Sequence, residues 1–384
     1  MSKLNELIQQ YCPDGVEYKK LCEICNLSRG KVYSKSYIEE NAGEYPVYSS
    51  QTANNGELGR ISTYDYDGEY LTWTTDGAYA GTIFYRKGKF SITNVCGLIS
   101  TKGDNLNIKF LFYWLSIKAP DYVYRGMGNP KLMSNQMEPI PIPVPPLPVQ
   151  EEIVRILDNF AELQAELQAE LQKRLQQYNY YRDNLLSFEG RTDIEWKKLG
   201  DVCNFMNGKG HEKSIVENGK YIVVNSKFIS TQGCVRKYSD KQISPLFVGD
   251  VLMVMSDLPN GRALAKCFIV DKDNLYTLNQ RICSLTVKNQ NELLSKYLFY
   301  ITNRNRQLLR FDNGVDQTNL KKDDILNILI PIISIAEQQR IVDILDRFDK
   351  LTNDITEGLP AEIEARRKQY EYYRDQLLTF KQKA

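Results

Sequence analysis

The sequence contains few residues in patterns that could carry out catalysis. It has no GxxxxGK(S/T) phosphate-binding loop and no GxGxxG dinucleotide fingerprint. Asn129 and Pro130 are followed by Lys131, whereas the NPP(Y/F) pocket of an amino-methyltransferase would need a second proline and an aromatic residue. The only histidine, His211, has no second metal ligand or carboxylate at a spacing that would indicate a metal or catalytic site. We therefore expect His211 to lie in a surface loop.

Two further segments resemble metal or nuclease motifs, and each has a simpler explanation. The carboxylates of residues 13–19 (PDGVEYK) lie too close together within one turn to bracket a strand. Cys22 and Cys25 form a single CxxC, whereas a zinc site needs a second pair of ligands. The residue equivalent to Cys22 in a later repeat is Gly200. We interpret the two cysteines as buried free thiols.

Polar loops are better candidates for binding than any motif is for catalysis. Asn, Gln and Arg can make bidentate contacts with base edges, while Ser, Thr and Lys bind phosphates. Each such residue is also ordinary in turns, so only the set as a whole favours a nucleic-acid interface. The candidates in the first half are Ser50, Gln51, Asn54, Asn55, Thr75, Asp76, Tyr79, Asn129 and Lys131. The candidates in the second half are Lys209, Asn225, Lys227, Arg262, Lys266, Asn279, Gln280, Arg281, Gln317 and Asn319.

The stretch 139–188 organises the rest of the chain. It opens with PIPIPVPPLP, a proline-rich segment that cannot be helical. No proline or glycine occurs between Val149 and Gly190, and Leu, Ile or aromatic residues recur there at helical spacing. The pattern predicts one helix of about 39 residues, roughly 58 Å long. Within it, three AELQ tetrads (Ala161–Gln172) align their leucines in a stripe that needs a partner.

A similar sequence occurs again near the C-terminus. Residues 338–348 (QQRIVDILDRF) match 150–160 at 7 of 11 positions, and 370–380 (YEYYRDQLLTF) match 178–188 at 8 of 11. The globular segments before each helix also begin alike, with EYKKLCEICN and EWKKLGDVCN. The chain therefore duplicates a unit made of a globular domain and a helix. We expect the leucine stripe to be covered by the second helix, because a long exposed stripe would aggregate. The alternative is that it pairs with a helix of another chain.

The globular segments contain strand-like runs rich in β-branched and aromatic residues, such as YLTWTT and GTIFYR in the first and KYIVVNSKFIS and DVLMVMSD in the second. We expect an α+β or mixed fold, with two α/β recognition domains separated by two long helices that form an antiparallel coiled coil. An internal pseudo-two-fold repeat relates the two halves. The expected boundaries are 1–145 and 191–333 for the domains, and 146–190 and 334–384 for the helices.

Composition sets the remaining bounds. The 384 residues are 42% hydrophobic and 25% charged, which is ordinary for a globular protein. The net charge of +1 does not by itself predict nucleic-acid binding. There is no run of 18 apolar residues and no signal-peptide pattern, so we expect a cytoplasmic protein that does not enter a membrane. The eight cysteines are scattered in a chain too long to need a disulfide framework.

The alternation of variable domain and repeated helix resembles the specificity subunit of type I restriction–modification enzymes. The resemblance rests on IPIPVPPLPVQEEIVRILDNF, EQQRIVDILDRF, GLPAEIEARRKQYEYYRDQLLTF and TDGAYAGTIFYRKGKFSITNVCG, and it covers essentially the whole chain. It implies two target-recognition domains that each read half of a bipartite, asymmetric site on double-stranded DNA, with the helices as a ruler between them. One departure is that the central helix has the AELQ array in place of the GLPAEI element at 358–363.

The resemblance also implies partners. Two modification subunits would bind S-adenosylmethionine and methylate adenine, and restriction subunits that use ATP and Mg could join them. This chain would hold no cofactor, no metal and no catalytic residue. The candidate docking residues are the equivalent turns Tyr181, Arg182, Asp183 and Tyr373, Arg374, Asp375. The alternative is that these residues only hold the helical pair together. Two equivalent surfaces can recruit two copies of one partner.

Two other classes of function stay open at this point. The chain could be a stand-alone DNA-modifying enzyme, which the missing catalytic motifs disfavour. It could also be a coiled-coil adaptor that binds only proteins, and a sequence-selective, salt-dependent interaction with duplex DNA would exclude that.

Overall fold

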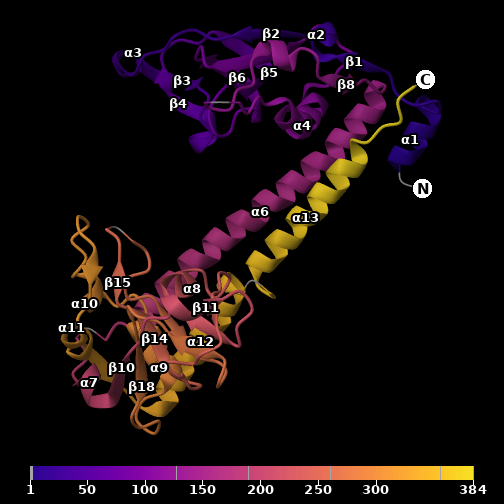
Figure 1. The fold of residues 1–384 in the computed structure, drawn as a ribbon. Coiled ribbons are helices and arrows are strands. Elements are labelled where there is room, and N and C mark those ends of the chain that lie inside the picture. The colour runs from indigo at the N-terminus through magenta and orange to yellow at the C-terminus, as the bar shows by residue number, and fades with distance from the viewer. Residues whose placement is uncertain (1–2, 127, 189, 260, 355, 384) are drawn as a thin grey trace. The chain divides into compact units, whose positions relative to one another are not determined.

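A computed structural model describes residues 3–126, 128–188, 190–259, 261–354 and 356–383 of the protein. The chain divides into two compact units, formed by residues 1–168 with 363–384 and by residues 169–362. Each unit holds one globular domain and part of each repeated helical segment (Figure 1).

A β-rich domain followed by a long helix makes up most of the first unit. The elements of this part of the chain are α1 (Lys3–Tyr11), β1 (Tyr18–Lys20), α2 (Leu21–Ile24), β2 (Cys25–Arg29), α3 (Lys35–Glu40), β3 (Ala42–Tyr48), η1 (Ala53–Gly56), β4 (Glu57–Ile61), β5 (Tyr66–Thr74), β6 (Ile83–Ile92), β7 (Cys96–Thr101), α4 (Ile108–Lys118), η2 (Ala119–Tyr122), α5 (Ser134–Met137), β8 (Pro141–Pro143) and α6 (Leu147–Leu185). The C-terminal part of α6, from Ala169 onwards, belongs to the second unit.

Six of these strands form the central sheet, in the order β2-β7-β5-β6-β3-β4. All neighbours are antiparallel except β3 and β6, which run parallel. Successive residues of a strand face opposite sides of a sheet. One face places Leu71, Trp73 and Ile83 in a core shared with α4 and the start of α6. The other face carries a smaller aromatic cluster that includes Tyr70 and Phe90.

The central helix α6 has 39 residues, as the absence of internal glycine and proline predicts. It includes Pro148 in its first turn, where a missing N–H costs nothing because that group has no helical partner. Ile153 and Leu157 near its start are fully buried, whereas every side chain described from Ala161 to Gln177 is at least partly exposed.

The second unit repeats the plan with shorter strands. The elements that follow α6 in the chain are β9 (Glu195–Lys198), α7 (Leu199–Val202), β10 (Cys203–Asn207), η3 (Glu212–Ser214), β11 (Ile215–Val216), β12 (Tyr221–Val224), α8 (Ser226–Ser230), β13 (Tyr238–Ser239), β14 (Val251–Val254), β15 (Ser256–Asp257), β16 (Cys267–Ile269), β17 (Tyr276–Leu278), β18 (Ile282–Val287), α9 (Ser295–Thr302), α10 (Arg306–Leu309), β19 (Thr318–Asn319), α11 (Lys322–Leu326), β20 (Leu329–Ile332), α12 (Ile335–Asn353) and α13 (Leu359–Leu377). Most of α13, from Ile363 onwards, belongs to the first unit.

Two four-stranded sheets, β10-β18-β14-β16 and β11-β13-β12-β17, form the body of the second unit. The run KYIVVNSKFIS, predicted as a strand, divides into strand β12 and helix α8. The helix begins there because Asn225 accepts a hydrogen bond from the N–H of Phe228 at 2.9 Å, which is a typical N-cap. In both domains, the apolar runs FLFYWL and YLFYIT are helices, α4 and α9.

The C-terminal repeat consists of two helices, α12 and α13, of 19 residues each. The side chain of Asp354 ends the first helix by accepting hydrogen bonds from the N–H groups of Thr356 and Glu357. A Cβ added at Gly358 would lie 2.5 Å from the carbonyl oxygen of Lys350, so the chain passes too close for any other residue. The four extra residues of this copy therefore form a tight connection between two helices.

Equivalent side chains hold the start of each repeat against its domain. Gln150 is fully buried and bonds three main-chain groups: the N–H of Asn107 (2.8 Å) and the carbonyls of Asn105 (2.9 Å) and Pro145 (2.7 Å). Gln338 makes the same three bonds in the second unit, to the N–H of residue 294 and the carbonyls of residues 292 and 333. The duplication therefore extends to individual hydrogen bonds.

Aromatic contacts show how the repeated helices pair within each unit. In the first unit, Phe160 near the start of one repeat stacks on Tyr373 near the end of the other, with ring centroids 5.6 Å apart. In the second unit, Phe348 stacks in the same way on Tyr181 at 5.3 Å. Because the start of one repeat meets the end of the other in both units, the pairing is antiparallel. The stripe of AELQ leucines is only half covered: Leu163 remains 49% exposed.

Candidate nucleic-acid interface

A glycine–lysine turn opens the polar edge of each domain. A Cβ added at Gly30 or Gly208 would lie 1.9 Å from the carbonyl oxygen of residue 92 or 279, so a side chain at either position would collide with the backbone. This close crossing places Lys31 beside Thr93 and Lys209 beside Asn279 as isolated β-bridges. The two turns therefore meet equivalent loops, residues 93–95 and 279–281.

In the first unit, three loops are joined by hydroxyl groups around Val95. The side chain of Thr75 donates to the carbonyl oxygen of Val95 at 2.6 Å, and that of Ser50 donates to the same oxygen. The N–H of Thr75 in turn donates to the Ser50 hydroxyl at 3.0 Å. Thr75 is only 2% exposed, so the prediction that it contacts the ligand is corrected: its hydroxyl is used to hold loops together.

A fourth loop, residues 125–131, joins the same edge. Lys131 forms β-bridges with Asp76 and with Tyr124, and the N–H of Tyr124 donates to its carbonyl at 2.8 Å. Lys131 and Asn129 are exposed, and Tyr79 in the neighbouring loop is 67% exposed. Met127 and Asn260, which belong to two of the predicted loops, lie outside the described residues.

The second unit brings together the corresponding loops by main-chain bonds. The N–H of Gln280 donates to the carbonyl of Lys209 at 3.1 Å, and the N–H of Met255 donates to that of Arg281 at 2.9 Å. The next strand, β15, pairs with β19, so that residue 256 lies opposite Asn319. The amide of Gln317 donates to the hydroxyl of residue 256 at 2.8 Å. These predicted residues therefore lie on one continuous edge.

Arg262 and Arg281 are exposed at this edge on fixed backbone. The carboxylate of Asp257 accepts hydrogen bonds from the N–H groups of Ala263 (2.7 Å) and Leu264 (3.1 Å), which fixes the loop that carries Arg262. Arg281 has a φ of 66°, a left-handed conformation that is uncommon for a residue with a side chain. Such conformations cluster at functional sites, where the surrounding structure enforces them.

Three predicted residues lie around helix α8, apart from these bridged loops. Asn225 caps the helix, and Lys227 is exposed on its first turn. Lys266 donates to the carbonyl of Ser230 at 3.1 Å, and burial followed by the charge of Arg304 lowers the pKa of its ammonium group. Lys266 is thus a half-buried structural lysine in this conformation.

His211 is buried, at 1% exposure, so the expectation of a surface loop residue is wrong. Its Nδ1 lies 2.7 Å from the carbonyl oxygen of Lys209, which can only accept, so Nδ1 carries a proton. Its Nε2 lies 2.9 Å from the hydroxyl of Thr277. The imidazole therefore braces the glycine–lysine turn of the second unit.

Several residues at the edge escaped prediction. Arg29 links two of the loops by donating to the carbonyl of Asn94 at 3.2 Å and to the sulfur of Met133 at 3.1 Å. Tyr124 also escaped prediction and is 61% exposed, next to the exposed Arg125, which opens the predicted loop 125–131. A tyrosine and arginine pair between an apolar helix and a glycine-rich loop was a visible signal, because both residue types are enriched at interfaces.

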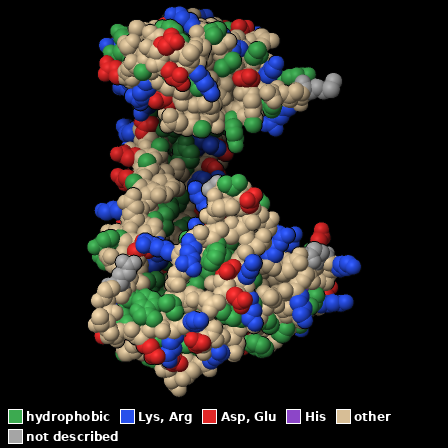
Figure 2. All heavy atoms as spheres, turned by 90° about the vertical axis from the view of Figure 1, so that its left-hand side faces the viewer, with side chains coloured by type: hydrophobic (Ala, Val, Ile, Leu, Met, Phe, Trp, Pro, Cys, Tyr) green, Lys and Arg blue, Asp and Glu red, His purple; other side chains and the backbone are tan. Residues whose placement is uncertain are grey.

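Basic and acidic side chains are interspersed on the surface of the protein. Figure 2 shows Lys and Arg side chains spread over the visible face of the second unit, the lower body in that view, with Asp and Glu among them. Beside the first unit's turn, Lys31 pairs with Asp65. Burial alone would raise the pKa of the Asp65 carboxyl, but hydrogen bonds from Lys31 and Tyr33 lower it below its ordinary value.

Each unit also presents an exposed aromatic stack at the end of a repeated helix. Tyr180 is 65% exposed and packs edge-on against Tyr181, at 5.6 Å and 74°. Tyr372 is 62% exposed and packs against Tyr373 at 5.4 Å and 73°. In each unit the inner tyrosine also stacks on the phenylalanine of the opposing repeat. The two surfaces are thus alike in composition, exposure and geometry, and only the inner tyrosines were predicted.

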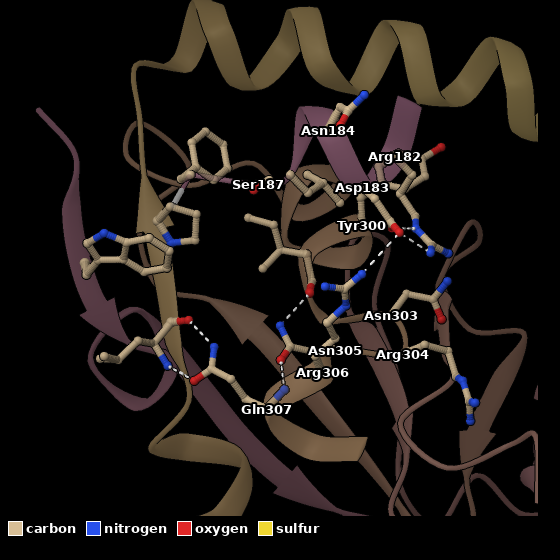
Figure 3. A pocket seen from close by; sticks show the side chains of 16 residues that line it. Arg182, Asp183, Asn184, Ser187, Tyr300, Asn303, Arg304, Asn305, Arg306 and Gln307 are labelled. Carbon is tan, nitrogen blue, oxygen red and sulfur yellow. Dashed lines mark hydrogen bonds and ion pairs between the residues drawn. The ribbon is translucent and has the colours of Figure 1, made fainter. Parts of the chain in front are cut away.

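The predicted Arg-Asp pairs follow these stacks. Arg182 bonds Asp183 at 2.8 Å, and Arg374 bonds Asp375 at 2.8 Å. In the second unit the pair borders a cavity of about 440 Å³, where Arg306 also approaches Asp183 at 3.4 Å (Figure 3). The corresponding hollow of the first unit, about 610 Å³, is bordered by Asp375 and by aromatic residues.

The chain thus contains two matched domains, each with a polar loop edge and the same helical attachment, which is the organisation of a protein with two binding surfaces. A family model described as the type I restriction modification DNA specificity domain matches residues 13–177 and 192–365. The chain is 36% identical over 394 residues to the specificity subunit of the Escherichia coli type I restriction enzyme EcoR124I/EcoR124II, covering 97% of this chain and 90% of that protein. It is 34% identical over 362 residues to a putative type I specificity subunit of Mycoplasma pneumoniae, covering 93% and 96%.

The fold agrees with these relatives. The type I restriction–modification S subunit from M. genitalium aligns with a TM-score of 0.59 at 15% identity, over 94% of this chain and 95% of that one. The chain therefore belongs to the type I restriction–modification specificity-subunit family, and it recognises DNA within such a complex. No helix in the described part of the chain is long and apolar enough to cross a membrane.

Proposed function

We propose that each unit reads one half of a bipartite, asymmetric DNA site through its own polar edge. This proposal rests on three loops that are joined in the same way in both units. Backbone hydrogen bonds and β-bridges connect a glycine–lysine turn, a loop before a central strand and a loop before α5 or α11. The backbone arrangement of these loops is alike in the two units, while their exposed side chains differ. This is what two domains that recognise different DNA sequences would need. Phosphate contacts would position each edge, and Asn, Gln and Arg would read bases.

We also propose that the two exposed aromatic stacks dock two copies of one modification subunit. Aromatic and arginine side chains dominate binding energy at protein interfaces. Surfaces that are alike in both units suit identical partners related by pseudo-two-fold symmetry. Methyl transfer, with its S-adenosylmethionine, would then take place in the partners, as would ATP and Mg chemistry in restriction subunits. This chain would supply recognition and assembly without a catalytic group.

Methylation mapping tests the reading proposal. DNA modified by the complex of this chain with its modification subunit is expected to carry methylated adenines in two different half-sequences separated by a constant, unread spacer. A single continuous motif would contradict the proposal. The purified chain alone is expected to transfer no methyl group from S-adenosylmethionine, and transfer by the chain alone would contradict its non-catalytic role.

Native mass measurement tests the docking proposal. The wild-type chain should bind two modification subunits at saturation. Replacing Tyr180 and Tyr181 by alanine, or Tyr372 and Tyr373, should leave one, because truncating buried interface aromatics costs about 2 kcal/mol or more each. Gln176→Ala, on the same helix and exposed, is the matched control and should leave two. Two bound copies in both tyrosine variants would refute this surface.

A further inference from the structure

Arg86, on strand β6 of the first unit, is an unusual buried charge. Its side chain is only 3% exposed, and no carboxylate among the described residues forms an ion pair with it. Its Nε donates to the hydroxyl of Thr72 at 3.1 Å, and its Nη2 donates to the carbonyl of Asn55 at 2.8 Å. The third nitrogen, Nη1, is buried without a hydrogen-bond partner. Burial lowers the pKa of the guanidinium group.

Two aromatic rings offset part of this desolvation. The guanidinium carbon lies 3.6 Å from the ring centroid of Tyr48 and 4.5 Å from that of Phe84. Arginine stacks well on aromatic faces because its guanidinium is planar and weakly hydrated. The rings do not supply the missing acceptor for Nη1, however. A buried charge without a counter-ion generally lowers stability, so a reason other than stability is needed for an arginine here.

The residue that Arg86 bonds belongs to the segment Ser49–Gly56, which we call the recognition loop. Asn54 and Asn55 both have left-handed backbone, with φ of 48° and 52°, and Gly56 follows with φ of 78°. The N–H of residue 49 donates to the carbonyl of Gly56 at 2.9 Å, which closes the loop. Adding a Cβ to Gly56 would place it 3.0 Å from Nη2 of Arg86, so the guanidinium lies directly against the closed loop.

Arg86 therefore fixes the carbonyl at the centre of three consecutive left-handed residues. Two of them, Asn54 and Asn55, are exposed amides of the kind that read adenine, and they leave the loop at the polar edge of the first unit. Strand β16 pairs with β14 in the second unit as β6 pairs with β5 in the first, and it contains no arginine. A buried arginine on this strand therefore occurs only in the first of the two units, as the structure describes them.

We propose that Arg86 is a positioning residue that fixes the recognition loop for the half-site read by the first unit. The proposal rests on the proposed reading of DNA by separate units and identifies the residue that sets one unit's specificity. Arg86 acts through Asn55 and does not itself touch the base. Because Arg86 is buried without a carboxylate partner, its role is to fix the loop conformation and not to form an ion pair.

The test is Arg86→Met in the complex with modification subunits, because methionine keeps the apolar volume and removes the charge and donors. Thermal unfolding and methylation mapping are measured together. The unfolding midpoint should stay equal or rise, while discrimination at the bases read by the recognition loop falls about tenfold, the size of one lost base contact. The other half-site should be unchanged. Arg60→Met, which breaks an exposed ion pair with Glu57 in the same unit, should alter neither half-site.

Other outcomes would overturn the inference. Unchanged discrimination in both half-sites would show that the loop holds without Arg86. A lowered midpoint with equal loss in both half-sites would assign it a structural role only. Arg86→Lys keeps the charge, but its single nitrogen cannot occupy the positions of both Nε and Nη2, so it should also relax one half-site, even where the methionine variant folds poorly. A wild-type complex that reads no bipartite site would refute the proposed function itself.

Discussion

The AELQ tetrads of α6 allow a quantitative prediction about the spacer between half-sites. Deleting Ala165–Gln168 removes four helical residues, which shortens the helix by about 6 Å and rotates the C-terminal part of the helix by about 400°, a net 40°. One base pair turns DNA by roughly 34–36°, from 10–10.5 base pairs per turn. Two base pairs would match the length better at about 3.4 Å each, but would need about 70° of rotation. Rotation therefore favours a change of one base pair.

The structure indicates that this deletion costs little stability. No described side chain of α6 from Ala161 to Gln177 is fully buried, whereas the buried residues that attach the helix, Leu157 and Tyr178, lie outside the deleted tetrad. The opposing repeat is already interrupted at residues 354–358 and contains no fully buried residue in α13. The deletion therefore removes no fully buried side chain.

The assay is sequencing of methylated sites after modification by the complex with the deletion variant. The expected result is a spacer one base pair shorter, with both half-site sequences unchanged. Replacing the same tetrad with four alanines keeps the helix length and should leave the spacer as it is. An unchanged spacer in the deletion variant would mean that the helices loop out, and altered half-sites would also refute the ruler.

Two predictions concern stability. Burial raises the pKa of Asp349 despite a hydrogen bond from Asn353, so its charged form is disfavoured in the folded protein. Asp349→Asn should therefore raise the unfolding midpoint at neutral pH, by roughly 2–4 °C for each kcal/mol gained in the free energy of unfolding. The gain should vanish below about pH 4, where aspartate is neutral. A gain that persists in acid would contradict this. Gln150→Ala should destabilise the first unit by roughly 3 kcal/mol, because it leaves buried main-chain groups unpaired, whereas the exposed neighbour Glu151→Ala should have little effect in the same denaturation experiment.

Residue types and spacing predicted the parts of the fold that repeat. The 39-residue helix followed from the absence of glycine and proline, and the antiparallel pairing followed from the need to cover its leucines. The connection at residues 354–358 depends on a side-chain cap and a close backbone approach that periodicity does not register. Local sequence therefore sets the long elements, while tertiary packing decides where they are interrupted.

The site was predictable only as a set of loops. Asn, Gln, Lys and Arg in turns predicted a set of loops that the structure brings together in each unit, but exposure could not be inferred residue by residue. Thr75 and His211 are buried because partners far along the chain, Val95 and Thr277, accept or share their hydrogen bonds. Arg86 looked like an ordinary strand residue in the sequence, since nothing local indicates that a distant loop covers it.

The most direct test of separate reading by the two units uses Gln280 and Arg281, which lie on the polar edge of the second unit. Both are replaced by alanine, and DNA modified by the complex is mapped for methylation. The expected result is relaxed preference in one half-site only, with each lost bidentate contact costing about 1–3 kcal/mol, while the other half-site and the spacer stay unchanged. Equal loss of discrimination in both half-sites would contradict the account.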